Sequence, residues 1–166
     1  MKRVFLSYPD KRLRSVCAAV DRVDDPVRAL WDDMLKAMYD MPGVGLAAPQ
    51  LGEMLRLIVV DGSETRNQPL CMANPEILHV SAVMREHEEA SPNIPNLWAM
   101  VKRPRAITVR FMDKNGAIIE QDFVGLWATS VQHQIDHLNG KLFIDHLSPV
   151  KRKMLLAKHA KNKRRR

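Results

Sequence analysis

The sequence has few cysteines and no long apolar run. Its two cysteines, Cys17 and Cys71, are isolated, which argues against a disulfide framework and fits a reducing compartment. We expect both to be small buried hydrophobic residues. No apolar stretch approaches the ~20 residues that a membrane span needs, and the apolar part of the N-terminus is far too short for a signal peptide. The sequence therefore predicts a cytoplasmic protein without a membrane segment.

Length and charge indicate one domain with an unusual C-terminal end. The chain has 166 residues, 46% of them hydrophobic and 27% charged, which is typical of a single soluble globular domain. The net charge is +7, but residues 151–166 contain nine of the 26 Lys and Arg residues and no acid. The other 150 residues contain 17 basic and 19 acidic side chains, so the basicity belongs to the C-terminus. Such a segment suits a polyanion such as nucleic acid.

Periodicity and capping signals predict three helices. The first spans about 26–40, where Asp24 or Asp25 can cap it and Pro26 suits its first turn. Its core-facing stripe consists of Val27, Leu30, Trp31, Met34, Leu35 and Met38. The second spans about 125–139 and ends at Asn139-Gly140, a good C-terminal cap. The third starts near Ser148-Pro149, and residues 161–166 should fray. Its inner face is predicted to contain Val150, Met154 and Leu155, with Lys151, Arg152, Lys153 and Lys158 largely outside that face.

The predicted strands do not alternate with these helices. We expect strands at 55–60, near 76–80 and 82–88, at 106–112 and 117–124, and a short one at 141–144. Asp113-Lys114-Asn115-Gly116 is a strong hairpin signal. Residues 8–14 and 61–69 are predicted loops, and residues 88–96, with two prolines, are predicted to be irregular or an edge segment. Without βαβ alternation, this order predicts an α+β fold.

The second predicted helix contains His133 and His137 at i and i+4. That spacing places both imidazole rings on one helical face, one turn apart, where they can bind one metal ion. In the zinc-hydrolase motif H-E-x-x-H, a glutamate beside the first histidine moves the proton. Here that position is Gln134, whose amide does not accept a proton at neutral pH. The sequence thus contains a metal-hydrolase pattern without its general base.

Three stretches together resemble the motifs of the peptide deformylases. Gly43-Val44-Gly45-Leu46-Ala47-Ala48-Pro49-Gln50 is similar to the first motif, and by itself it would be only a glycine turn that lacks the dinucleotide fingerprint. Glu89-Ala90-Ser91-Pro92-Asn93-Ile94-Pro95 aligns with the second, E-G-C-L-S-x-P. His133-Gln134-Ile135-Asp136-His137 resembles the third, and the resemblance extends over roughly residues 4–150.

The resemblance implies a deformylase-like fold in which β-sheets surround a central helix that carries the metal site. In that family Fe²⁺ or Zn²⁺ is held by the second-motif cysteine and both histidines, and the enzyme removes the formyl group from the N-terminal methionine of nascent peptides. The residues implied as ligands here are Ser91, His133 and His137, and those implied for catalysis are Gln50 and Gln134. The substrate would lie along Gly43, Val44, Gly45 and Leu46 like an added strand.

Three of these positions depart from the family pattern. Ser91 replaces the cysteine, and a neutral hydroxyl is a much poorer ligand than a thiolate. Gln134 replaces the glutamate, and losing a positioned acid–base group costs ~10²–10⁴ in rate. Pro92 replaces the residue whose backbone N–H would stabilise the oxyanion, a loss of ~10²–10³ that leaves Gln50 alone. We therefore expect hydrolysis to be weak or absent.

Two alternatives concern the metal. A register shift that brings His87, Glu88 or Glu89 to the site would build a set of two histidines and one carboxylate. Otherwise His133 and His137 are hydrogen-bonded pocket residues, and the site holds no metal at all.

The sequence therefore predicts a deformylase-like domain at 1–150 and a basic helix or tail at 151–166. The expected function is that of an impaired deformylase. The alternatives are a non-catalytic module that binds nascent N-termini or the ribosome, an active hydrolase of another N-acyl substrate, and a partner subunit of an active deformylase. The expected partners are nascent peptide N-termini and, through residues 151–166, the ribosome or its RNA, with no membrane partner.

Overall fold

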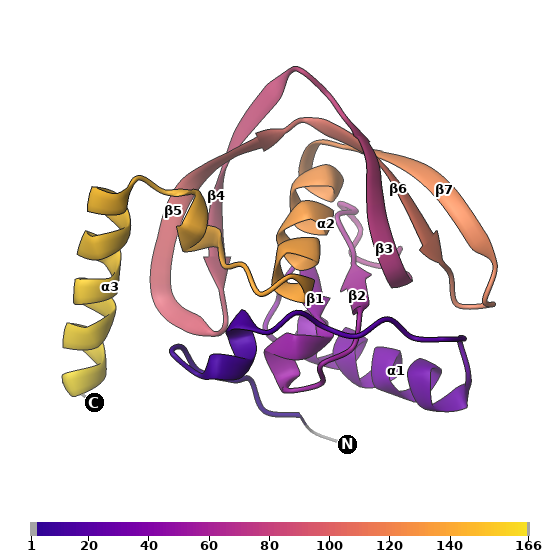
Figure 1. Cartoon of the computed structure of the whole chain (residues 1–166), viewed down its shortest axis with the longest axis horizontal. Helices are drawn as coiled ribbons and strands as arrows, with labels where there is room; N and C mark the ends of the chain where they lie inside the picture. The colour runs from indigo at the N-terminus through magenta and orange to yellow at the C-terminus, as the bar shows by residue number, and fades with distance from the viewer. Residues whose placement is uncertain (1–2, 166) are drawn as a thin grey trace.

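A central helix lies between two β-sheets in the computed structural model, which describes residues 3–165 (Figure 1). The helix is α2 (Gly125–Leu138). One sheet has five strands in the order β1-β2-β3-β6-β7, and the other pairs β4 with β5. The strands are β1 Gly45–Ala47, β2 Leu57–Val60, β3 Leu70–Val80, β4 Met84–Ser91, β5 Ile94–Pro104, β6 Ala106–Met112 and β7 Ile118–Val124. The predicted α+β class, with sheets around a central helix, is confirmed.

The five-stranded sheet has an apolar layer on each face. In β2 every residue is buried, and alternate side chains point to opposite faces. Ile58 and Val60 pack toward α2, whereas Leu57 and Val59 pack toward α1 (Asp25–Asp40). This two-sided burial fixes α2 against one face of the sheet.

The first helix was predicted correctly. The Asp24 carboxylate accepts a hydrogen bond from the Val27 N–H, and Pro26 lies in the first turn of α1. The predicted stripe is buried except for Leu35, which is half-buried. Both cysteines are buried and free, as expected.

The end of α2 depends on Gly140. Its φ of +72° lies in the left-handed region, and a Cβ atom there would be 2.3 Å from the Arg14 carbonyl oxygen. Only glycine fits this approach, which holds the N-terminal segment against the end of the helix. The predicted Asn139-Gly140 terminus is therefore confirmed.

Residues 88–96 were predicted to be irregular or an edge segment; the edge alternative is confirmed, and the irregular one is wrong because most of the segment forms regular strands. β4 continues to Ser91 and β5 begins at Ile94, so Pro92 and Asn93 form the turn of a hairpin. Pro95 is tolerated because the sheet has only two strands, and each strand has an edge without a strand partner. The register shifts between Ala90 and Ser91, and such an irregularity re-aims side chains beside functional sites.

One shorter prediction was wrong, and another was confirmed only in part. The expected strand at 141–144 is instead the 3₁₀ turn η3 (Phe143–His146), because the Asp145 carboxylate accepts a hydrogen bond from the Leu142 N–H. The expected loop at 8–14 contains the 3₁₀ turn η1 (Lys11–Arg14), which Asp10 caps. Short capped turns of this kind carry no periodic apolar signal.

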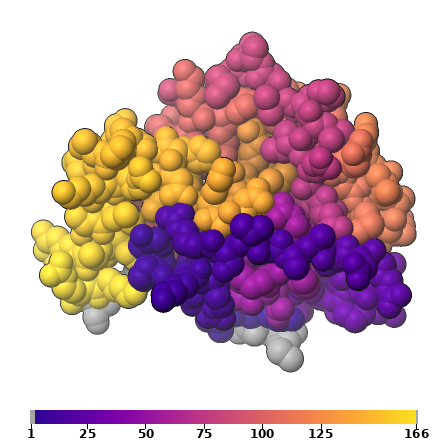
Figure 2. Space-filling model, in the orientation of Figure 1, coloured from indigo at the N-terminus to yellow at the C-terminus, as the bar shows by residue number. Residues whose placement is uncertain are grey.

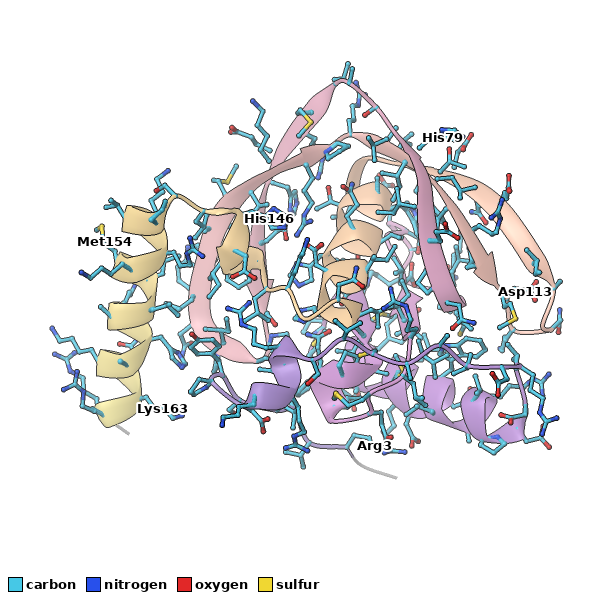
Figure 3. The ribbon with its side chains drawn as sticks, viewed as in Figure 1. Arg3, His79, Asp113, His146, Met154 and Lys163 are labelled. Atoms are coloured by element: carbon cyan, nitrogen blue, oxygen red, sulfur yellow. The ribbon has the colours of Figure 1, made fainter. Side chains whose placement is uncertain are left out.

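The C-terminal helix α3 (Pro149–Arg164) lies beside β5 and is capped by Ser148 (Figures 1 and 2). It continues to Arg164, so the predicted fraying from Lys161 was wrong for that stretch, and Arg166 lies outside the described residues. The inner face was predicted correctly only at Leu155. Val150 and Met154 are 70% and 67% exposed, and Met154 points away from the body (Figure 3). Leu155 and Leu156 instead pack on a cluster formed by β5 and η3.

The described part of α3 is strongly basic. Its exposed side chains include Lys151, Lys153, Lys158 and Lys161, whereas Arg152 is half-buried. Within residues 3–165, no helix combines the length and the apolar character that crossing a membrane requires.

Candidate functional site

A cleft of about 440 Å³ lies between the two sheets, with α2 at its base. One wall is formed by residues 41–45, the opposite wall by residues 87–92, and the base by residues from the first turns of α2. The predicted site residues that line it are Gly43, Val44, Gly45, Gln50, Ser91, His133 and Gln134. Two predicted residues do not line it: Leu46 packs in the α1 cluster, and His137 lies behind His133. The lining contains Glu88 and Glu89 and no Lys or Arg among the described residues.

The two histidines face each other. Their Nε2 atoms are 3.2 Å apart, and His133 Nδ1 lies 2.7 Å from Glu89 Oε1. Because a carboxylate only accepts, we assign the proton of His133 to Nδ1, which leaves the Nε2 lone pair facing His137. Burial, followed by the neighbouring His133, lowers the pKa of His137 well below its ordinary value, so this imidazole is neutral. His137 Nδ1 is buried and has no hydrogen-bond partner among the described residues.

Behind the histidines lies a buried ionic cluster that sequence reasoning did not find. Arg103 donates to both carboxylate oxygens of Glu89, at 2.7 and 2.9 Å, and to Asp136 at 2.9 Å. Burial raises the pKa of Glu89, but hydrogen bonds from His133 and Arg103 outweigh it and lower that pKa to about 2. The Oδ2 atom of Asp136 also lies 2.7 Å from Nε2 of His146, a residue of η3 beside β5 (Figure 3). This cluster fixes the orientation and tautomer of His133.

Arg103 was missed because β5 itself was missed. Had the strand been recognised, the inward alternation of Val101 and Arg103 would have marked a buried cation in need of partners. No local signal pointed to Asp136 or His146 as its neighbours.

The third ligand position, Ser91, belongs to a hydrogen-bond network instead. Its hydroxyl donates to Asn93 Oδ1 at 3.2 Å and accepts from Gln50 Nε2 at 3.4 Å. Gln50 Nε2 also donates to Asn93 Oδ1 at 2.8 Å, and Gln50 Oε1 accepts from the Ala47 N–H. Asn93, another residue that the sequence did not reveal, further donates to the carbonyl of Leu6. The side-chain donors of Gln50 and Ser91 are therefore occupied within the protein.

Gln134 lies against the Gly45 backbone at the end of the cleft. A Cβ atom at Gly45 would be 2.7 Å from Gln134 Nε2 and 2.4 Å from Ser130 Oγ, so the close approach of α2 and β1 requires glycine. Gln134 is 5% exposed, and its Oε1 atom is buried without a hydrogen-bond partner among the described residues. An unsatisfied buried acceptor is costly and calls for a donor from an occupant of the site.

The residues present do not complete the ligand set of a divalent metal ion. Two nitrogens 3.2 Å apart could each lie ~2.0–2.1 Å from one ion, so the histidine pair alone has suitable geometry. The third donor is the Ser91 hydroxyl, which already donates to Asn93. Glu89 contacts the opposite nitrogen of His133, so the alternative of two histidines and one carboxylate is not assembled. Residues 3–165 contain no group of three His, Cys, Asp or Glu side chains arranged to hold a metal.

An α+β domain with an i,i+4 histidine pair on a central helix, facing a cleft, has the scaffold of a metal-dependent hydrolase. The family model described as polypeptide deformylase matches residues 2–153. The chain therefore belongs to the polypeptide deformylase family.

Individual relatives agree over nearly the whole chain. A peptide deformylase from Hydrogenovibrio crunogenus is 49% identical over 154 residues, which cover 93% of this chain and 90% of that protein. The crystal structure of a peptide deformylase from Legionella pneumophila superposes with a TM-score of 0.91 at 41% identity, covering 99% and 96% of the two chains. A class I type b peptide deformylase from Acinetobacter baumannii, solved with Met-Ala-Ser bound, has a TM-score of 0.83 at 29% identity and covers 89% and 99%.

Proposed function

We propose that this protein binds the N-terminal end of a nascent peptide in its cleft and hydrolyses a formyl group there weakly or not at all. The observation that carries the proposal is the side chain beside His133. In the family pattern this position holds the glutamate that moves the proton, and here it holds the amide of Gln134. The cleft is thus retained while the group that performs acid–base chemistry is not.

The geometry of the cleft suits an extended peptide. β1 is the outermost strand of its sheet, and the cleft follows residues 43–45 just before and at the start of this strand. An extended peptide can add to such an edge through main-chain hydrogen bonds. The bound Met-Ala-Ser of the Acinetobacter baumannii relative supports a peptide as the occupant.

Hydrolysis requires a proton to pass from the attacking water to the departing amine. Gln134 cannot carry that proton, which alone costs about 10²–10⁴ in rate. Gln50 Nε2 is directed at Asn93 Oδ1, and Pro92 has no N–H, so the formyl oxygen also loses donors, at about 10²–10³ each. These losses need not multiply because the groups act together, but either one would leave little turnover.

The test restores the family residues. We would compare the wild type with the triple variant Ser91→Cys, Pro92→Leu and Gln134→Glu, using formyl-Met-Ala-Ser as substrate and measuring both turnover and metal per chain after anaerobic loading with Fe²⁺, Ni²⁺ or Zn²⁺. We expect substoichiometric metal in the wild type, and at least about 10²-fold more turnover with more bound metal in the triple variant. The matched controls are Ser15→Cys, which adds a thiol outside the cleft, and Gln121→Glu at an exposed position of β7.

Stoichiometric metal in the wild type, with turnover that disappears in His133→Ala, would overturn the proposal of impaired hydrolysis. It would instead support an active hydrolase whose third ligand is not the thiolate. Peptide binding without turnover in the wild type would support the binding role.

We also propose that α3 carries a second function, attachment to the ribosome or its RNA, as a basic segment (151–166) added to a deformylase-like domain (1–150). The exposed lysines of α3 favour it, among them Lys151, Lys153, Lys158 and Lys161. Changing these four to Gln should abolish salt-sensitive cosedimentation with ribosomes. Changing four exposed body lysines to Gln (Lys11, Lys36, Lys102 and Lys114) removes the same charge and should have little effect. Equal loss in both variants would indicate attraction by net charge alone.

A further inference from the structure

We call the base of the cleft beside His133 and Gln134 its closed end. This end offers an acceptor rather than free donors, which bears on the form of peptide terminus that it can hold. Among the described residues, Gln134 Oε1 is a buried acceptor without a hydrogen-bond partner. The Nε2 atoms of His133 and His137 are 3.2 Å apart and are hydrogen-bonded to each other, so they leave the acceptor of Gln134 as the one to be satisfied at this wall. A ligand that donates a hydrogen bond would satisfy Gln134 Oε1, and a ligand that only accepts would not.

The donors that a formyl oxygen would need are already used. Gln50 Nε2 donates to Asn93 Oδ1 at 2.8 Å, and the Ser91 hydroxyl donates to the same oxygen at 3.2 Å. Pro92 contributes no N–H to the cleft wall. A carbonyl oxygen placed here would lose its hydrogen bonds to water without replacement, which is unfavourable.

The charges around the cleft favour a cation. Its lining includes residues Glu88 and Glu89 and no Lys or Arg among the described residues. Of the two carboxylates, that of Glu89 is buried and faces His133, whereas Glu88 is exposed. Glu89 is paired with Arg103, but that buried cluster contains two carboxylates, Glu89 and Asp136, for one guanidinium, with His146 at its far end.

The arginines next to the cleft lie behind its lining: Arg103 pairs with Glu89, Arg85 donates to Thr129 Oγ1, and Arg66 donates to the Gly43 carbonyl. No cationic Lys or Arg side chain of the described residues therefore lines the space that an ammonium group would enter.

From these observations we propose that the closed end of the cleft recognises the free α-ammonium group of a peptide in preference to an N-formyl group. The inference rests on the proposed function, that the cleft holds peptide N-termini, and it names the form of the terminus. The ammonium group would donate to Gln134 Oε1. The protein would then bind chains whose formyl group has already been removed.

The test measures the affinity of three peptides that differ only at the terminal nitrogen: Met-Ala-Ser, formyl-Met-Ala-Ser and acetyl-Met-Ala-Ser. Titration calorimetry at about pH 6.5 keeps the free amine protonated, and a chelator removes metal. We expect Met-Ala-Ser to bind at least about tenfold more tightly than either acylated peptide, as one charge-assisted hydrogen bond would give. Equal or tighter binding of the formyl peptide would overturn the inference while leaving the proposed function intact. Binding of none of the three would overturn the proposed function itself.

Variants at Gln134 test the assigned acceptor. Gln134→Leu removes the acceptor at similar size, so it should lower the ratio of Met-Ala-Ser affinity to acetyl-Met-Ala-Ser affinity toward one. Gln134→Glu keeps an acceptor and adds negative charge, so it should retain or strengthen the preference for Met-Ala-Ser over the acylated peptides. This second variant keeps the test valid if Gln134→Leu fails to fold. Gln121→Leu, at an exposed position of β7 outside the cleft, is the matched control. A preference that persists in Gln134→Leu would rule out Gln134 as the acceptor.

Discussion

The buried cation Arg103 provides a direct test of how the histidines are held. Its side chain is almost fully buried and bridges the carboxylates of Glu89 and Asp136. Arg103→Met keeps an unbranched apolar stem but leaves both carboxylates without their cation. Breaking a buried pair from one side costs about 3–5 kcal/mol of stability, because the remaining charge is uncompensated. For a domain whose whole stability is about 5–15 kcal/mol, this is a large fraction.

The measurement is urea unfolding followed by circular dichroism at about pH 7, comparing transition midpoints at unchanged slope. The matched control is Arg110→Met on β6, where Arg110 pairs with Glu120 at 2.9 Å while the two side chains are 47% and 54% exposed. That exposed pair is worth less than about 1 kcal/mol. Adding Glu89→Gln to Arg103→Met should recover part of the loss, because it removes one unpaired charge. Equal costs for Arg103→Met and Arg110→Met would refute the assignment of a buried cluster that fixes His133.

Two further predictions concern the segments around α2. Gly140→Ala would place a Cβ atom 2.3 Å from the Arg14 carbonyl oxygen at a residue with positive φ. It should therefore lower the unfolding free energy clearly more than Gly125→Ala, where φ is +61° but no atom lies within 4 Å of the added Cβ. The left-handed strain alone costs about 1–2 kcal/mol, and equal urea midpoints would contradict the clash. Burial raises the pKa of Asp145, but hydrogen bonds from Arg14 and the Leu142 N–H lower it below 3.8 overall. The stabilising effect of Asp145 should therefore be full above about pH 4 and be lost as the pH falls below that value. The thermal unfolding midpoints of the wild type and Asp145→Asn should then converge in acid. A difference between the midpoints that stays constant with pH would contradict this prediction.

The parts of the fold that the sequence revealed are those with local signals. α1 combines a cap, a first-turn proline and a stripe at helical spacing, and all of these act within one element. The β6–β7 hairpin is specified by a turn whose residues Asp113 and Gly116 determine its geometry. The histidine helix was found from its i,i+4 pair and its terminal glycine.

The parts that remained hidden depend on contacts between distant residues. The β4–β5 hairpin was anticipated only in part. The two prolines predicted an irregular or edge segment at 88–96, but not that one proline would lie in a hairpin turn and the other in an edge strand that continues to Pro104. Asn93 is central because it joins Ser91, Gln50 and the carbonyl of Leu6, which are far apart in sequence. The inner face of α3 was misassigned because apolar residues occur around the helix, and only packing on β5 selects Leu155 and Leu156.

The departures from the family pattern change the electrostatics of the cleft in one direction. Ser91 and Gln134 stand where the resemblance to the family motifs implies a thiolate and a carboxylate, so under the proposed function two anionic groups that would balance a divalent cation are absent. Asn93, where the family motif has serine, supplies the carbonyl oxygen that accepts the donors of both Ser91 and Gln50. What remains at the closed end are neutral acceptors. Neutral acceptors cannot compensate the desolvation of a doubly charged ion as anionic ligands do, but they can satisfy the N–H groups of a singly charged ammonium. Cysteine or glutamate returned alone would restore only one of the two charges, which is why turnover should require the combined variant.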